Sequence, residues 1–276
     1  MDDLVSTAWL AQRLANPDFV ILDATMFMPG EPRDAAAEFA QGHIPGARRF
    51  DIDALSDPDH PAPHMLPGAA AFGAAMVALG VGRDDCIIVY DNSPLHSATR
   101  AWFMLRHYGA DRVAILDGGL SKWRAEHRPL EQGEAAPRRA RFDAVERNTI
   151  VTKAMLTGGA RGPILDARAR GRFDGSVADP RPGVAPGHIP GARNLPFGDL
   201  YRDDGTLKFD SALAAEFEAA GVDPQSGFTA TCGSGVTATS LLFAARRIGG
   251  RDARLYDGSW SDYGADPATP KALGPA

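Results

Sequence analysis

The sequence predicts an α/β fold in two tandem copies, each a mostly parallel sheet with helices on both faces. Two observations support this prediction. The chain of 276 residues repeats several short motifs at a spacing of about half its length. Within each copy, short apolar runs alternate with segments of helical period. Strands that alternate with helices form parallel sheets covered by helices, so the pattern predicts that architecture twice.

The repeat is clearest in a heptapeptide. Gly-His-Ile-Pro-Gly-Ala-Arg occupies residues 42–48 and again residues 187–193. An Ile-Leu-Asp-Ala motif likewise places Asp23 in the first copy and Asp166 in the second. The spacings are 145 and 143 residues, which chance would rarely bring so close. We therefore predict a duplicated domain. His43 and His188 recur with the heptapeptide, so we expect a structural role for both.

The first copy shows the alternation most plainly. Its apolar runs predict strands over residues 20–23, 87–91 and 113–117. Its segments of helical period predict helices over residues 7–15, 69–79 and 97–107. In such sheets ligands bind beyond the carboxyl ends of the strands, where the loops begin.

The second copy contains a strand, a tight loop and a helix around Cys232. A short apolar run, residues 228–231, ends at this cysteine, and the sequence Gly-Ser-Gly follows before a segment of helical period. Gly233 and Gly235 allow backbone angles that let successive N–H groups converge. Together with the start of the helix, these donors should hold the sulfur as a thiolate at the tip of the strand. The alternative is a buried cysteine that merely ends a core strand.

The repeat and the composition together divide the chain. We predict a first domain over residues 1–130, a polar linker over 131–148, a second domain over 149–264 and a tail over 265–276. Asp91 is the counterpart of Cys232, so only the second domain carries the thiol. The first domain should therefore be non-catalytic.

Composition excludes several classes of partner. The formal net charge of −6 gives no reason to expect nucleic acid. The sequence contains no apolar run long enough for a membrane span and no basic, apolar start typical of a secretory signal. The two cysteines, Cys86 and Cys232, lie far apart and form no metal-ligand spacing. We therefore expect free thiols, an inert Cys86, a cytoplasmic location and no bound metal.

Three motifs carry a resemblance to a known family. They are Cys-Gly-Ser-Gly-Val-Thr-Ala at 232–238, the doubled Gly-His-Ile-Pro-Gly, and Asp-Gly-Gly-Leu-Ser-Lys-Trp at 117–123. Over nearly the whole chain the sequence resembles the tandem rhodanese-domain sulfurtransferases, and its cysteine loop resembles the 3-mercaptopyruvate type. The thiosulfate type carries Arg and Lys directly after the cysteine, whereas Gly233 and Ser234 are neutral here. A donor with a single carboxylate needs less positive charge beside the sulfur than the thiosulfate dianion does.

The resemblance also implies the groups that bind the substrate. Arg172 and Arg181 match the family's pattern, and they would clamp the carboxylate and ketone oxygen of the substrate, as the planar guanidinium fork suits. The loop residues that would contact the substrate beside the sulfur are Gly233, Gly235, Val236 and Thr237. The alternative for each arginine is an ordinary solvated surface charge.

Proton transfer would involve both halves of the sequence. Ser234 can donate a hydrogen bond to the sulfur or to the substrate. The family's pattern places Asp53 and His64 against it in a triad-like relation, and histidine is suited to moving a proton near neutral pH. The alternative is that this Asp and His only stabilise turns.

These observations predict an enzyme that moves the sulfur of 3-mercaptopyruvate through a Cys232 persulfide and needs no metal or organic cofactor. The resemblance implies thioredoxin, a low-molecular thiol or cyanide as the acceptor. Thiosulfate:cyanide sulfurtransfer and a non-catalytic sulfur-carrier or regulatory module stay open as alternatives. A phosphatase of the Cys-x5-Arg kind is excluded, since Ala238 stands where that reaction requires arginine.

Overall fold

The chain forms two compact units. The computed structural model describes residues 1–133, 135, 138–159 and 162–275. Unit 1 consists of Met1–Ser56, Leu66–Asn148 and Asp203–Leu207, and unit 2 of Asp57–Met65, Thr149–Arg202 and Lys208–Ala276. The division predicted from the sequence was contiguous, whereas residues 57–65 join unit 2 and residues 203–207 join unit 1. Both segments are polar loops without hydrophobic periodicity, so no sequence pattern could assign them.

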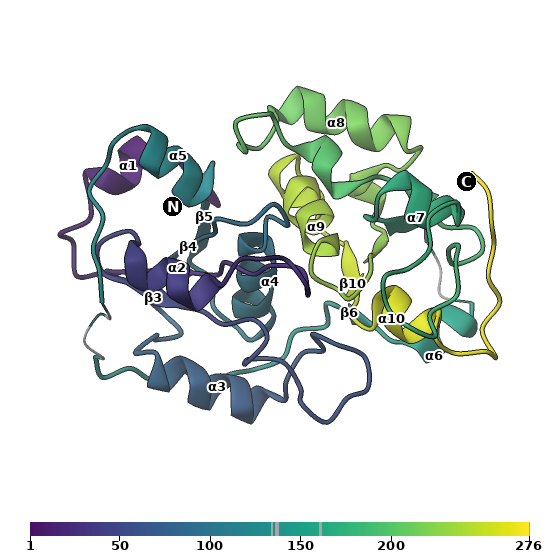
Figure 1. The fold of residues 1–276 in the computed structure, drawn as a ribbon, viewed down its shortest axis with the longest axis horizontal. Helices are drawn as coiled ribbons and strands as arrows, with labels where there is room; N and C mark the ends of the chain where they lie inside the picture. Colours follow the sequence, from purple (N-terminus) through teal and green to yellow (C-terminus); the bar gives the residue numbers. More distant parts are fainter. Residues whose placement is uncertain (134, 136–137, 160–161, 276) are drawn as a thin grey trace. The chain divides into compact units, whose positions relative to one another are not determined.

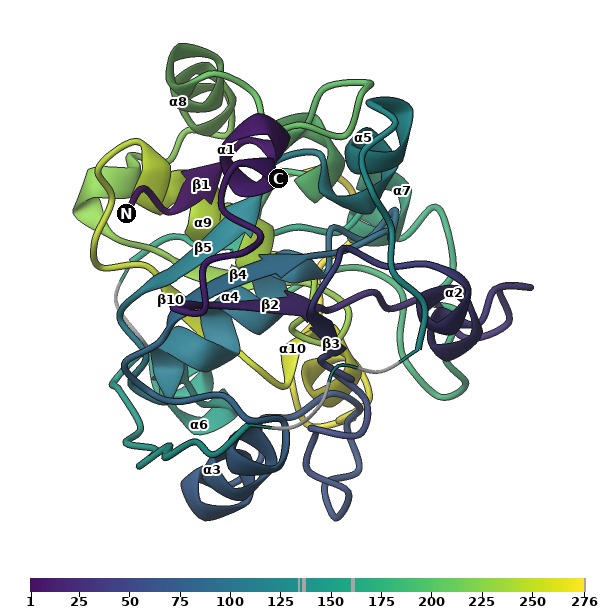
Figure 2. The same ribbon diagram turned by 90° about the vertical axis from the view of Figure 1, so that its left-hand side faces the viewer.

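Unit 1 is a five-stranded, all-parallel sheet with helices on both faces (Figure 2). Its elements are β1 (Leu4–Val5), α1 (Thr7–Ala11), β2 (Phe19–Asp23), α2 (Ala35–Gln41), β3 (Ala47–Arg49), α3 (Ala69–Ala78), β4 (Cys86–Tyr90), α4 (Ala98–His107), β5 (Val113–Leu116) and α5 (Gly119–Ala125). The strand order is β1-β5-β4-β2-β3. The helix predicted over residues 7–15 ends at Ala11, and tighter turns, such as the one closed by the N–H of Arg13 and the carbonyl of Leu10, replace its last part.

Unit 2 repeats this topology. Its elements are β6 (Ile150–Val151), α6 (Lys153–Thr157), β7 (Ile164–Asp166), α7 (Arg170–Asp174), β8 (Arg193–Asn194), η1 (Phe197–Leu200), α8 (Asp210–Ala219), η2 (Pro224–Ser226), β9 (Thr229–Thr231), α9 (Ala238–Arg247), β10 (Arg254–Tyr256) and α10 (Ser259–Tyr263). The order β6-β10-β9-β7-β8 is that of unit 1, strand for strand, and all neighbours are parallel. The predicted fold class is therefore confirmed (Figure 1).

The sheet of unit 1 is buried on both faces. On one face, Ile88 of β4 belongs to a core cluster with Leu10 of α1 and Trp123 of α5. The alternate residue Ile87 is equally buried and points to the opposite face, where α4 packs against β4 and β5. Figure 2 shows α1 and α5 on one side of the sheet and α3 and α4 on the other. Two buried faces explain why the strands read as continuous apolar runs.

The repeated histidines of the heptapeptides brace their turns in the same way. The ring of His43 stacks on Phe39 with centroids 3.9 Å apart, and its Nδ1 lies 2.8 Å from the Phe39 carbonyl oxygen. The ring of His188 stacks on Phe173 at the same centroid distance, with Nδ1 2.9 Å from that residue's carbonyl oxygen. Each histidine thus fixes a helix end to the following turn, which agrees with the structural role expected from the repeat.

The predicted linker, residues 131–148, runs along unit 1. The backbones of Glu131 and His43 exchange two hydrogen bonds, and the N–H of Val145 donates to the carbonyl of Tyr108. Residues 134 and 136–137 of this segment lie outside the described residues. The described part is therefore bound along its length to one unit, although its composition resembles that of a free tether.

The predicted tail, residues 265–276, is anchored to unit 2 through its described part. Ala272 exchanges two backbone hydrogen bonds with His188, and the buried hydroxyl of Thr269 donates to the carbonyl of Tyr263 at 2.6 Å. Residue 276 lies outside the described residues. The tail is held by backbone pairing, which leaves no hydrophobic pattern in the sequence. Among the helices of the described residues, none is both long and apolar enough to cross a membrane.

Candidate active site

Cys232 follows the central strand of the sheet in unit 2. β9 lies between β10 and β7, and it ends at Thr231, while α9 begins at Ala238. Residues 232–237 therefore form the loop at the carboxyl end of this strand, where parallel sheets bind their ligands. Gly235 has a φ of +79°, in the left-handed region that favours glycine. That conformation lets the loop turn directly into the helix.

The residues after β10 hold the main chain of the loop. The carbonyl of Cys232 accepts a hydrogen bond from the N–H of Trp260 at 3.0 Å. The carbonyl of Gly233 accepts two from Ser261, one from its N–H at 2.8 Å and one from its hydroxyl at 2.5 Å. These bonds tie the start of the loop to the neighbouring strand's turn.

The remaining loop donors are available to an anion. Among the hydrogen bonds of the described residues, none has the N–H of Gly233, Ser234, Val236 or Thr237 as its donor. These groups directly precede α9, a helix of ten residues whose N-terminus adds the positive end of its dipole. The loop therefore has the properties of a site for negative charge.

A buried aspartate organises the two predicted arginines. Arg172 lies in α7 and Arg181 in the loop after it. The carboxylate of Asp179 accepts a hydrogen bond from Nη2 of Arg172 at 2.6 Å and another from the backbone N–H of Arg181 at 3.0 Å. The Asp179 side chain is 1% exposed, whereas each arginine side chain is 22% exposed. Asp179 thus fixes both arginines beside each other.

The two guanidinium groups meet over Gly233. A Cβ at this position would lie 3.1 Å from Nη2 of Arg172 and 3.2 Å from Nη1 of Arg181. Nε of Arg172 and Nη1 of Arg181 are buried and have no hydrogen-bond partner within the described residues. Burial lowers the pKa of Arg181, while the negative charge of Asp179 opposes this effect. The geometry is that of an anion site beside the cysteine.

Ser234 joins His64 to the arginine pair. The hydroxyl of Ser234 accepts a hydrogen bond from Nη2 of Arg181 at 3.3 Å and lies 2.7 Å from Nδ1 of His64. Because the arginine is only a donor, the hydroxyl hydrogen can be given to the imidazole. His64 has a φ of +61°, an unusual conformation for a non-glycine residue. A serine and a histidine in this contact can pass a proton.

The structure thus brings five of the predicted residues together in unit 2: Cys232, Ser234, His64, Arg172 and Arg181. Asp53 belongs to unit 1, where its carbonyl accepts a hydrogen bond from the N–H of Ser56 at 3.1 Å. The triad-like role of Asp53 stays a prediction.

The thiol is buried, a feature that the alternative of a cysteine ending a core strand shares. Cys232 is only 2% exposed. The turn after β10 hydrogen-bonds its backbone, and the two guanidinium groups approach the next residue closely. A buried cysteine in apolar surroundings is inert, but this sulfur has a cationic environment. We therefore expect it to react with small anions that the arginines can bind.

Sequence reasoning missed Asp179, Ser259 and Ser261. Asp179 precedes Pro180 in an arginine-rich loop, where a carboxylate reads as an ordinary surface charge. The two serines lie in Asp-Gly-Ser-Trp-Ser at 257–261, the counterpart of Asp-Gly-Gly-Leu-Ser at 117–121. Ser259 stands where the first copy has Gly119, and this difference was a signal. Only the turn of the second copy has a hydroxyl at this position that can form hydrogen bonds.

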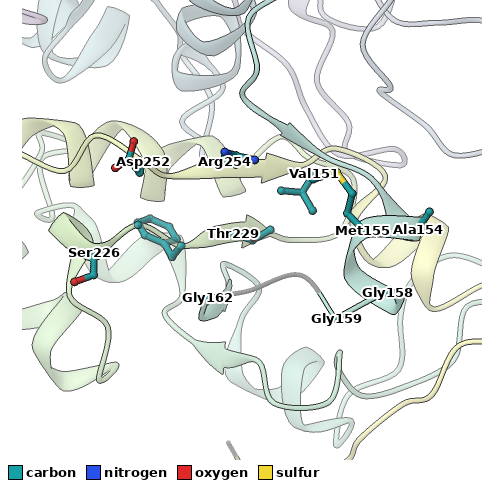
Figure 3. A pocket seen from close by; sticks show the side chains of 12 residues that line it. Val151, Ala154, Met155, Gly158, Gly159, Gly162, Ser226, Thr229, Asp252 and Arg254 are labelled. Atoms are coloured by element: carbon teal, nitrogen blue, oxygen red, sulfur yellow. The ribbon is translucent and has the colours of Figure 1, made fainter.

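A cavity in unit 2 lies at the other end of the sheet (Figure 3). It has a volume of about 580 Å³ and is lined by Thr229 and Arg254, which begin β9 and β10, and by Met155 of α6. Cys232 instead follows the carboxyl end of β9. The cavity is therefore separate from the cysteine site.

Comparisons with known proteins agree with this geometry. A family model described as a rhodanese-like domain matches residues 6–126 and 151–266. The chain is 44% identical over 266 residues to a 3-mercaptopyruvate sulfurtransferase of Escherichia coli strain K12, covering 95% of this chain and 94% of that protein. It is 40% identical over 270 residues to the human protein of the same name, covering 94% and 91%. A bovine thiosulfate sulfurtransferase is 36% identical over 271 residues, with coverage of 94% and 91%.

Solved structures show the same similarity. The crystal structure of SseA, a 3-mercaptopyruvate sulfotransferase from Escherichia coli, superimposes with a TM-score of 0.86 at 40% sequence identity, covering 94% of this chain and 99% of that chain. The Tum1 protein of Saccharomyces cerevisiae superimposes with a TM-score of 0.88 at 30% identity, covering 99% of both chains.

Proposed function

The chain belongs to the rhodanese family, and from this premise we propose that it is a 3-mercaptopyruvate sulfurtransferase that works through a persulfide on Cys232. One observation carries the proposal. A chain that is similar to such enzymes over nearly its whole length holds two guanidinium groups over Gly233, next to the cysteine. Both arginines retain a buried N–H without a partner among the described residues, which suits a carboxylate substrate.

The first half-reaction is a nucleophilic displacement. The Cys232 thiolate attacks the sulfur of 3-mercaptopyruvate, the carbon–sulfur bond breaks, and its electron pair leaves with pyruvate as the enolate. The proton of the substrate thiol ends on the enolate carbon, which gives pyruvate. The enzyme is left with the persulfide anion Cys–S–S⁻, which the loop N–H groups and the start of α9 stabilise.

Each polar group near the cysteine has a role in this step. Arg172 and Arg181 bind the carboxylate and ketone oxygen and so orient the donor's sulfur toward Cys232. The Ser234–His64 pair moves the proton, because the hydroxyl can donate to Nδ1 of the imidazole.

The second half-reaction returns the enzyme to its thiolate form. A nucleophilic acceptor attacks the outer sulfur, the sulfur–sulfur bond breaks, and the electron pair returns to Cys232. With cyanide the product is thiocyanate, and with a thiol it is a new persulfide. Thioredoxin or a low-molecular thiol is the acceptor that we favour, and the cytoplasmic location expected from the sequence stays a prediction.

Intact-mass measurement tests the covalent step. Incubation with 3-mercaptopyruvate should add one sulfur atom to the protein, and cyanide should remove it with formation of thiocyanate. Cys86→Ser is the matched control and should keep the gain, because Cys86 begins β4 of unit 1 whereas the arginine pair lies over Gly233 of unit 2. Absence of the added sulfur, or its survival in Cys232→Ser, would contradict the mechanism.

Thiosulfate transfer is the second candidate, since a pair of arginines can also bind a dianion. We expect kcat/KM to favour 3-mercaptopyruvate, because Gly233 and Ser234 place no cation of their own in the loop. A preference for thiosulfate would reverse the assignment of the donor and leave the persulfide mechanism intact.

A further inference from the structure

Ser259 has an unusual backbone conformation directly beside Cys232. Its φ is +50°, and its side chain is fully buried. The left-handed region is costly for a residue with a Cβ, so the surrounding structure must impose it. The hydroxyl of Ser259 donates to the carbonyl of Tyr256 at 2.9 Å and accepts a hydrogen bond from the N–H of Cys232 at 3.1 Å.

Unit 1 has the same backbone without the side chain. Gly119 has a φ of +54°, and the N–H of Leu120 donates to the carbonyl of Asp91, as that of Trp260 donates to Cys232. A Cβ on Gly119 would collide with the carbonyl oxygen of Asp91. The turn therefore exists in both units, but only unit 2 accommodates a side chain in it. The costly residue stands in the unit with the thiol.

The hydroxyl of Ser259 completes a set of anchors around Cys232. In the peptide group before the cysteine, the Thr231 carbonyl accepts from the N–H of Ala167 at 2.8 Å, and the Cys232 N–H donates to Ser259. In the peptide group after it, the Cys232 carbonyl is held by Trp260. With both peptide planes fixed, the direction of the Cα–Cβ bond and the position of the sulfur are fixed as well.

We propose that Ser259 is a positioning residue for the Cys232 sulfur, an inference that rests on the proposed function. It binds the N–H of the cysteine, so that the thiolate keeps its place beside the arginine pair and the loop donors. Without the hydroxyl, the peptide before Cys232 loses one of its anchors and can tilt, which moves the sulfur relative to the donor bound by the arginines. A displacement of this kind lowers kcat more than it raises KM.

Two substitutions separate the hydrogen bond from the backbone strain. Ser259→Ala removes the acceptor and keeps the strain. Ser259→Gly removes both, and it should fold because unit 1 uses glycine in this conformation. We expect both variants to lose about tenfold or more in kcat while KM stays within about twofold of the parent value. The melting temperature of the glycine variant should be at least that of the alanine variant.

Alkylation of Cys232 by iodoacetate, followed against pH, gives a readout that is independent of sulfur transfer. Both variants should show a changed pH profile, and Ser226→Ala, at an exposed serine of unit 2, should match the parent in every measurement. Parent-like kcat and alkylation in either variant at position 259 would overturn the inference. If the parent transfers no sulfur but its alkylation still depends on Ser259, the proposed function fails and the positioning role stands.

Discussion

The loops after β4 and β9 occupy equivalent places in their sheets, but they use their hydrogen-bond donors in opposite ways. In unit 1 the carboxylate of Asp91 folds back onto its own loop, accepting hydrogen bonds from the N–H of Ala98 at 2.6 Å and from that of Ser93 at 3.2 Å. In unit 2 the corresponding residue is Cys232, and four loop N–H groups have no acceptor among the described residues. One loop uses its donors on its own carboxyl group, and the other leaves its donors for the sulfur that we propose to be reactive.

The comparison shows that a duplicated fold supplies the same donors twice but not the same chemistry. A carboxylate that bonds the start of the following helix removes the site for any other anion. Unit 2 keeps the site open, and it adds two guanidinium groups and a serine–histidine pair around it. The identity of one residue at the end of a strand thus distinguishes the unit to which we assign the proposed persulfide.

Cys232→Asp should have the largest effect, because it gives the loop of unit 2 the side chain of unit 1. We expect sulfur transfer to fall by on the order of 10⁴-fold or more, as it does when a covalent nucleophile is lost. Cys232→Ser should be as inactive but should keep an open anion site. Thiosulfate should therefore raise the melting temperature of the serine variant and not that of the aspartate variant. Equal stabilisation of both would show that the carboxylate does not occupy the loop.

Arg181→Ala tests the second difference between the units, the cationic groups over Gly233. Loss of a charged hydrogen-bond donor to the carboxylate should lower kcat/KM for 3-mercaptopyruvate by about 10- to 100-fold. The variant should also lose the preference of Cys232 for anionic iodoacetate over neutral iodoacetamide. Arg170→Ala is the control, since that arginine is 72% exposed and pairs with Asp199. An unchanged reagent preference in Arg181→Ala would mean that the arginine does not act on anions at the thiol.

Gly233→Ala should have a smaller effect of the same kind. The added methyl group would stand 3.1 to 3.2 Å from the two guanidinium groups, which must shift by a few tenths of an ångström. We expect KM to rise by about three- to tenfold with little change in melting temperature, since only flexible side-chain ends move. Gly198→Ala, with open space around the new Cβ, is the control. A parent-like KM in Gly233→Ala would contradict the close approach of the arginines.

The fold could be predicted from the sequence, and the candidate site residues could be named from it, although their roles stay predictions. Duplicated motifs revealed the two units, and the glycines beside Cys232 revealed the loop. Asp179 left no such pattern, because it acts by holding the side chain and backbone of other residues, and Ser259 left only a single glycine-to-serine difference between the two copies. The sequence left the burial of Cys232 open, since the turn after β10 that hydrogen-bonds its loop is adjacent only in the folded sheet.

Asp91→Asn should leave sulfur transfer unchanged and alter only the pH dependence of stability. Burial raises the pKa of Asp91 to about 7, against the opposing effect of the hydrogen bonds from Ala98 and Ser93. Below about pH 4 the folded and unfolded states both hold the proton, so this group causes no loss of stability. Between about pH 4 and 7 only the folded state keeps it, and the free energy of unfolding falls with rising pH.

The free energy of unfolding should fall by about 4 kcal/mol at most and should level off above pH 7, where Asp91 is ionised in both the folded and the unfolded state. Asparagine cannot ionise, so relative to the parent the variant should gain stability by a similar amount as the pH rises from 4 to 8. Urea unfolding across this range measures the difference, with Asp18→Asn on the surface of unit 1 as control. If the free energies of unfolding of variant and parent differ by the same amount at every pH, Asp91 is already ionised in the folded state at pH 4. The loop of unit 1 would then stabilise a charge as readily as the loop that we assign to the persulfide.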